Sequence, residues 1–280
     1  MLPLLLLFLL VVYGLPQPFL GGHEKSVIGG YNITDMTTYP FVAYVYMEGK
    51  TPAQSGMCTC TLLSARFVML PAHCAERIDL RRKSKSFVRA GTWHITDMFP
   101  IGGQGQQRAV KSVRLDPFWD PARQPEYDFA ILEVEPFTPS PYIGFVHIPI
   151  SDWVVDMFHT TVTFLGYGLD ANDQPQNLQI KWIMTMPYEQ CVKYWEQRCR
   201  RDGCDCAGKP CNIDVRKTLF CVQDTLTPGD SGGPAIVGGH EGHYHQIGML
   251  GRENLFLRVS KFCSFIALST YGENRCVQNV

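Results

Sequence analysis

Gly229-Asp230-Ser231-Gly232-Gly233-Pro234 is the most specific stretch of this sequence. It places a serine between glycines, in a loop that enters the apolar run at residues 235–237. Glycine adopts backbone conformations that other residues rarely reach, so we expect a tight turn around Ser231. A serine between glycines is, by itself, usually only a loop. Its meaning therefore depends on what precedes it in the chain.

Two other short motifs precede this loop. Pro71-Ala72-His73-Cys74 follows an apolar stretch, and Tyr127-Asp128-Phe129-Ala130 opens another. A histidine beside a cysteine is usually structural, and an aspartate before an apolar strand is usually a turn residue. Taken together, His73, Asp128 and Ser231 stand in the chain order that one fold uses for a general base, the residue that orients this base and the nucleophile.

Between and around these motifs, short apolar stretches alternate with Gly and Pro. They are rich in Val, Ile, Phe, Tyr and Thr, which is typical of an all-β sandwich or barrel. Helical spacing is scarce and is found near residues 188–200 and 260–270. The expected strands lie at residues 41–46, 62–70, 87–90, 109–115, 129–134, 161–165, 180–186, 234–237, 246–250 and 255–259.

The bulk properties fit an exported globular protein. The 280 residues carry a formal net charge of −1, which gives no indication of a nucleic-acid partner. Eleven cysteines would be unusual in the cytosol, and export permits disulfides. Because eleven is odd, at least one thiol is unpaired or bonded to another chain.

The N-terminal residues resemble a targeting signal. Residues 2–12 form a nearly unbroken apolar run that is too short to span a bilayer, and Gly14 and Pro16 follow it. We expect a signal peptide at residues 1–14 and a short propeptide at residues 15–26. No later stretch suggests a membrane anchor, so the expected location is extracellular.

With these motifs in place, the chain resembles the trypsin and chymotrypsin family of serine proteases from Val27 to about Thr270. The resemblance implies an all-β fold of two six-stranded antiparallel β-barrels packed together, with a C-terminal helix. The expected protease domain covers residues 27–275. Val27-Ile28-Gly29-Gly30 is similar to the family's mature N-terminus, which implies that the amine of Val27 pairs with Asp230 after cleavage. Ser26, and not Arg or Lys, precedes that segment.

The resemblance also implies roles for single residues. Ser231 is the nucleophile, His73 its general base and acid, and Asp128 the carboxylate that fixes the His73 tautomer. Backbone N–H groups of Gly229 and Ser231 form the oxyanion hole. Two disulfides are implied as well, Cys58–Cys74 beside the histidine and Cys191–Cys221.

The sequence departs from the family around the specificity pocket. The floor of the pocket is expected at Thr225, with Asp224 as its neighbour, and Thr227 stands where the family usually has a cysteine. Met249-Leu250-Gly251-Arg252 replaces the strand that normally lines the pocket, and the loop that follows looks deleted. Specificity for Lys or Arg is therefore not expected.

Three smaller features leave alternatives open. Cys199, Cys204, Cys206 and Cys211 form disulfides or, as the lesser alternative, bind zinc. Cys60 is a candidate for the odd thiol, and Asn32-Ile33-Thr34 is a glycosylation sequon. His240, His243 and His245 cluster, but we expect no metal site there.

The expected function is a secreted serine endopeptidase that works through an acyl-enzyme and is made as a zymogen. The alternative is a weak or inactive serine protease homologue that acts as a binding or regulatory module. An α/β-hydrolase esterase is a distant third, because strands do not alternate with helices. The expected partners are protein or peptide substrates, with an activating protease or a serpin-type inhibitor. We expect no cofactor, no nucleic acid and no membrane anchor.

Overall fold

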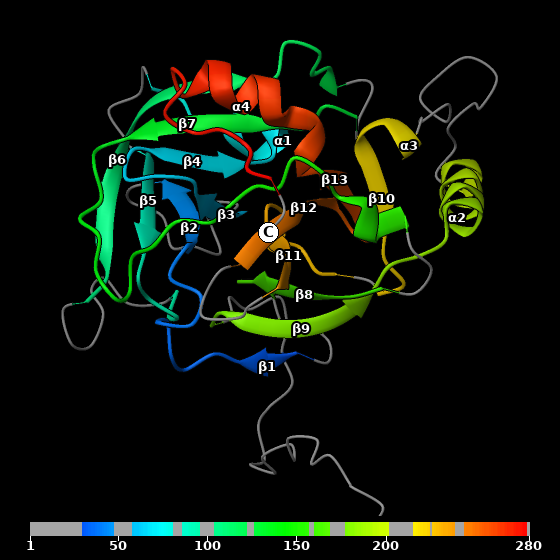
Figure 1. Cartoon of the computed structure of the whole chain (residues 1–280), viewed down its shortest axis with the longest axis horizontal. Helices are drawn as coiled ribbons and strands as arrows, with labels where there is room; N and C mark the ends of the chain where they lie inside the picture. Colours follow the sequence, from blue (N-terminus) through cyan, green and yellow to red (C-terminus); the bar gives the residue numbers. More distant parts are fainter. Residues whose placement is uncertain are drawn as a thin grey trace, which may run out of the picture.

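The computed structural model contains two antiparallel β-sheets that pack against each other (Figure 1). Among the described residues, no helix is long and apolar enough to cross a membrane. The structure describes residues 30–47, 58–80, 86–95, 104–121, 126–156, 160–168, 177–201, 215–224, 226–238 and 244–278.

The first sheet is a closed barrel of six strands in the order β2-β3-β4-β7-β6-β5. Val68 on β4 pairs with Leu132 on β7, and both side chains are buried inside the barrel. The one-turn helix α1 (Ala72–Ala75) follows β4 directly. The strands are β2 (Val42–Met47), β3 (Cys58–Leu62), β4 (Phe67–Leu70), β5 (Ser86–Ala90), β6 (Gln106–Leu115) and β7 (Ala130–Val134).

The second sheet has seven strands in the order β1-β9-β8-β11-β12-β13-β10. Six of these strands, from β9 to β10, form the second barrel, which is completed by a bridge between Thr185 and Val222 just beyond β9 and β10. The short strand β1 is added at the outer edge of β9. The strands of this sheet are β1 (Tyr31–Asn32), β8 (Thr161–Gly166), β9 (Gln179–Met184), β10 (Leu219–Cys221), β11 (Pro234–Gly238), β12 (Tyr244–Arg252) and β13 (Leu255–Arg258).

Helices lie at the periphery of the sheets (Figure 1). The 14-residue α2 (Tyr188–Arg201) and the C-terminal η4 (Val259–Phe262) with α4 (Cys263–Ser269) occupy the two regions where the sequence shows helical spacing. The described residues also contain two short helical segments, η2 (Trp153–Asp156) and α3 (Val215–Thr218).

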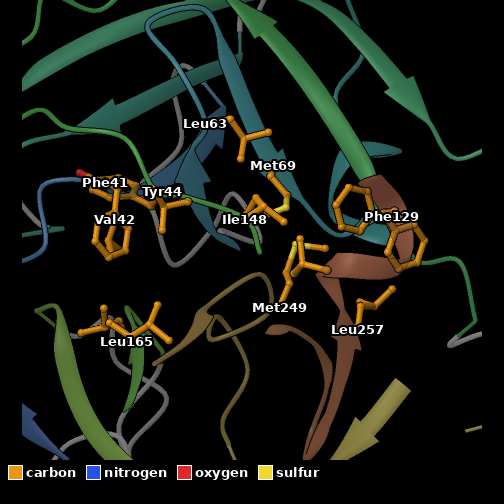
Figure 2. Packing of buried hydrophobic residues seen from close by; sticks show 14 of the residues in the cluster. Phe41, Val42, Tyr44, Leu63, Met69, Phe129, Ile148, Leu165, Met249 and Leu257 are labelled. Atoms are coloured by element: carbon orange, nitrogen blue, oxygen red, sulfur yellow. The ribbon is translucent and has the colours of Figure 1, made fainter. Parts of the chain in front are cut away.

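The largest buried cluster lies between the two sheets and holds them together. Figure 2 shows Met69 of β4 facing Met249 of β12, and Phe129 near Leu257 of β13. Phe129 also stacks on Phe262 of η4, with 4.2 Å between ring centroids. Burial of a large apolar side chain stabilises the folded state by about 1.5–3 kcal/mol, so this junction fixes how the sheets sit relative to each other.

Candidate active site

His73 is presented by the short helix α1. Pro71 occupies the position before the first helical residue, with extended backbone angles. The disulfide between Cys58 and Cys74 ties this turn to β3. The turn therefore cannot move independently of the barrel wall.

Asp128 binds His73 at two points. One carboxylate oxygen accepts a hydrogen bond from the His73 backbone N–H at 2.8 Å, and the other lies 2.6 Å from Nδ1 of the ring. Asp128 is only 2% exposed, so water does not compete for this carboxylate. A proton on Nδ1 that faces the carboxylate leaves Nε2 free to accept another proton.

The backbone on both sides of Asp128 holds it in place. Tyr127 adopts a φ of 57°, which is unusual for a residue with a side chain, and its carbonyl accepts a hydrogen bond from Phe129 N–H at 2.6 Å. Phe129 is fully buried against Phe262. Strained backbone of this kind is found most often at functional sites.

Ser231 lies in a tight loop between β10 and β11. Gly229 and Gly232 have φ values of 90° and 87°, as expected for the glycines around the serine. A Cβ at position 232 would lie 2.0 Å from the Thr59 carbonyl oxygen, so only glycine fits there. Ser231 is partly exposed.

The groups that would contact a substrate are not engaged with the described part of the protein. Within that part, no hydrogen bond involves Ser231 Oγ or the backbone N–H groups of Gly229 and Ser231. His73 Nε2 lies 3.4 Å from Cys74 Sγ. Hydrogen bonds between catalytic groups are often long without substrate, so this geometry is compatible with a triad.

Asp230 is completely buried. It accepts hydrogen bonds from Gly168 N–H at 2.9 Å and from the backbone N–H and hydroxyl of Thr227 at 3.0 and 2.9 Å. Burial raises the pKa of Asp230 to about 6, although these hydrogen bonds oppose the shift. Val27, its expected partner, lies outside the described residues.

In the region of the expected specificity pocket, hydrogen bonds join the segment after β10 to the turn after β12. Strands β12 and β13 are joined by a two-residue turn, Glu253-Asn254, in which Glu253 has a φ of 50°. Leu226 N–H donates to the Glu253 carbonyl at 3.3 Å, and Val222 N–H donates to the Asn254 carbonyl at 3.0 Å. The two segments expected to wall the pocket are therefore hydrogen-bonded directly to each other.

Apolar side chains occupy the space behind this contact. Leu226 is only 4% exposed and belongs to the same buried cluster as Phe220, Leu250 and Phe256. Asp224 forms an ion pair with Lys181 at 2.8 Å. Thr225, the expected pocket floor, lies outside the described residues.

Several other sequence-based expectations can be placed. The structure contains the Cys58–Cys74 and Cys191–Cys221 bridges and a third, Cys263–Cys276. Among the described cysteines, Cys60 is free and buried, and burial strongly raises the pKa of its thiol. The side chains of Cys199, Cys204, Cys206 and Cys211 lie outside the described part, as do His240 and His243.

The remaining expectations concern His245, Asn32 and metals. His245 lies beside His147, with 6.2 Å between ring centroids. Asn32 is exposed on β1, and its side-chain oxygen accepts a hydrogen bond from Gln179. Cys58, His73 and Cys74 lie close enough to suggest a metal cluster, but both sulfurs belong to the disulfide and cannot serve as thiolate ligands.

Three residues of the site were not identified from the sequence. Thr59 donates a hydrogen bond from its hydroxyl to the Gly229 carbonyl at 3.2 Å. Leu226 and Glu253 are hydrogen-bonded to each other and join the two expected pocket walls, as described above. Thr59 has no sequence signal beyond its place beside Cys58, whereas the short spacing between Arg252 and Leu255 indicated that a loop was lost.

Comparisons with known proteins agree with this geometry. Residues 27–253 match the family model described as Trypsin. The chain is 25% identical over 181 residues to the mouse atrial natriuretic peptide-converting enzyme, covering 64% of this chain and 15% of that protein. It is 23% identical over 281 residues to CLIP domain-containing serine protease B10 of Anopheles gambiae, covering 90% of this chain and 73% of that protein.

A solved structure shares the fold. It is a scabies mite inactivated protease paralogue, with a TM-score of 0.65 and 19% identity, covering 88% of this chain and 98% of that one. At this identity the likeness concerns the fold alone. The family model, in contrast, covers most of the chain and includes His73, Asp128 and Ser231. The chain belongs to the trypsin family.

Proposed function

We propose that the chain is an exported serine endopeptidase that hydrolyses peptide bonds through Ser231, His73 and Asp128. The observation that carries this proposal is the double contact of Asp128 with the backbone and ring of His73, at 2.8 and 2.6 Å. A histidine held in this way is oriented as a base, and a merely structural histidine does not require it. Export is supported by the disulfides among the described residues.

The chemistry follows from these positions. His73 Nε2 removes the proton from Ser231 Oγ as the oxygen attacks the substrate carbonyl carbon. The backbone N–H groups of Gly229 and Ser231 stabilise the negative oxygen of the tetrahedral intermediate. His73 then gives the proton to the leaving amine, and an acyl-enzyme on Ser231 remains. Water, deprotonated by His73, attacks the acyl carbon. His73 then returns that proton to Ser231 Oγ as the ester bond breaks and the acid is released.

The contact between the two expected pocket walls limits which substrate side chains this enzyme accepts. Leu226 is buried, and its N–H donates to the Glu253 carbonyl, so the two segments expected to wall the pocket lie against each other. Asp224 is engaged with Lys181 and does not stand free to bind a basic side chain. We therefore expect slow cleavage, after small residues, with no preference for Lys or Arg.

A second candidate function is a non-catalytic protease homologue that binds other proteins. The same contact between the expected pocket walls favours it, because substrate positioning contributes a large part of the rate of such enzymes. The mosquito relative is named a serine protease, whereas the solved structure with this fold is named an inactivated one. The relatives therefore include both kinds of protein.

A fluorophosphonate probe separates the two candidates. The endopeptidase predicts that the wild-type chain is labelled and that Ser231→Ala is not. Ser264→Ala, which alters an exposed serine on α4, is the control and should be labelled like wild type. Labelled protein should then cleave a mixed peptide library after small residues. Absence of labelling in folded wild-type protein would overturn the endopeptidase and leave the binding module.

A further inference from the structure

Two threonine hydroxyls hold the loop that carries Ser231. The Thr227 hydroxyl donates to one oxygen of Asp230 at 2.9 Å, and the Thr227 backbone N–H donates to the same oxygen at 3.0 Å. From the other sheet, the Thr59 hydroxyl donates to the Gly229 carbonyl at 3.2 Å and accepts from Tyr167 N–H at 3.1 Å. The loop is thus bonded at both of its ends.

The contact from Thr59 fixes a peptide plane. When the carbonyl of Gly229 faces Thr59, the N–H of Asp230 faces the opposite way, where it donates to the Thr227 carbonyl at 3.1 Å. That bond closes the turn from Thr227 to Asp230. The Thr59 carbonyl also lies against Gly232, where no Cβ would fit. Strand β3 therefore sets the conformation of the loop on both sides of Ser231.

The buried carboxylate of Asp230 is satisfied by neutral donors. Besides Thr227, Gly168 N–H donates to its other oxygen at 2.9 Å. A Cβ at position 168 would lie 2.4 Å from Asp230 Cγ, so the glycine makes room for the carboxyl group. The nearby cation is Lys181 on β9, which lowers the Asp230 pKa from a distance while its ammonium is paired with Asp224. Three donors are enough to hold an ionised carboxylate.

We propose that Thr59 and Thr227 are positioning residues for the oxyanion loop, Thr227 to Ser231, and that their hydroxyls keep it formed without an ammonium group released by cleavage before Val27. The proposal concerns how the active site is formed, and it rests on the proposed function. It predicts that retaining residues 15–26 does not prevent reaction at Ser231. The hypothesis of a cleavage-dependent zymogen predicts the reverse.

The variants are chosen to remove a hydroxyl with little change of shape. Thr227→Val and Thr59→Val each delete one donor, and Thr227→Ser and Thr59→Ser restore it. Thr37→Val is the matched control, because Thr37 donates from its N–H and hydroxyl to Asp35 at 2.9 and 2.7 Å in an exposed turn. Each variant is made in two forms, one that retains residues 15–26 and one that begins at Val27.

The first measurement is the rate of fluorophosphonate labelling of Ser231. We expect the two wild-type forms to agree within about threefold, because less than 1 kcal/mol separates them if the loop is already formed. Thr227→Val and Thr59→Val should each lower the rate about tenfold or more in both forms, as expected for a lost hydrogen bond to a buried acceptor. The serine variants and Thr37→Val should behave like wild type. Labelling that requires the Val27 form and ignores Thr227→Val would overturn the proposal.

The second measurement does not depend on activity. The pKa of Asp230, followed by carboxyl ¹³C NMR in the form that retains residues 15–26, should rise in Thr227→Val and return in Thr227→Ser. A merely structural threonine would not move this pKa in both directions. If no form is labelled, the proposed function fails, and the titration alone decides this proposal. An Asp230 pKa that is the same in wild type and Thr227→Val would then refute it.

Discussion

The closed barrel and the seven-stranded sheet supply different halves of the site. The barrel presents His73 and Asp128 in a fully bonded pair beside a disulfide. The second sheet presents Ser231 in a well-formed loop, but its β12–β13 hairpin ends in a two-residue turn that is hydrogen-bonded to the segment after β10. The proposed histidine–aspartate pair and the expected pocket walls therefore lie in different sheets.

The largest expected effect tests the barrel half. If the chain is active, Asp128→Asn should lower kcat/KM on the order of 10⁴-fold at neutral pH, because the wrong tautomer of His73 becomes favoured. Activity against the peptides cleaved by wild type measures this loss. Asp116→Asn is the control, since Asp116 is also buried but accepts from Phe118 N–H instead of His73. Equal losses in both variants would show that Asp128 acts through the fold alone.

The next effect tests what holds the second sheet. Arg258 on β13 makes paired hydrogen bonds to Asp152, at 2.8 and 2.9 Å, and both side chains are almost fully buried. Arg258→Met should lower the free energy of unfolding by about 3–5 kcal/mol, because the Asp152 carboxylate would stay buried without its partner. Urea denaturation measures the change.

An exposed ion pair provides the comparison for that variant. Arg66 binds Glu273 at 2.7 Å on the barrel side, and both side chains face solvent. Arg66→Met should change stability much less than Arg258→Met, since water replaces an exposed partner. Similar losses in the two variants would mean that burial does not govern the strength of these pairs.

A smaller effect concerns pH. The pKa of Asp230 is raised by burial from 3.8 to about 6 in the folded state. The folded state therefore binds more protons than the unfolded state between these values, and the contribution of Asp230 to stability falls as pH rises through this window. The loss should be roughly 2–3 kcal/mol by pH 7, since one pKa unit corresponds to about 1.4 kcal/mol.

The variant Asp230→Asn isolates this contribution. Asp152 changes stability in the opposite direction, because Arg258 keeps the Asp152 pKa low despite its burial, so stability is lost there as pH falls. The difference in unfolding free energy between wild type and Asp230→Asn, measured from pH 4 to pH 7, cancels that opposing effect. A difference that does not vary with pH would contradict the raised pKa.

The smallest effect concerns the β12–β13 hairpin. The Asn254 side-chain amide donates to the Val222 carbonyl at 3.2 Å and joins the turn to the segment after β10. Asn254→Ala should cost about 1 kcal/mol of stability and leave the His73–Asp128 pair intact. Thermal unfolding and the NMR signals of His73 check the two parts. A perturbed histidine would show that the two halves of the site are coupled.

Sequence patterns were a good guide to the strands of the structure. The predicted strands at residues 41–46, 62–70 and 129–134 overlap β2, β4 and β7, whose apolar side chains face a barrel interior. The three-residue β10 was missed, since Leu219–Cys221 is too short to show a pattern. The second sheet contains the expected six-stranded barrel, which closes through one bridge, and it gains the edge strand β1.

By itself, the sequence determined the family and the all-β class and was enough to propose the three residues of a triad, because these depend on residue types at positions that few other folds combine. Only the tertiary structure decided which groups surround them. Thr59 and Thr227 lie 168 residues apart in the chain, and the packing of the two sheets brings both to one loop. Likewise, Leu226 meets Glu253 because two strands pair, and hydrogen bonds between distant segments leave no local trace in the sequence.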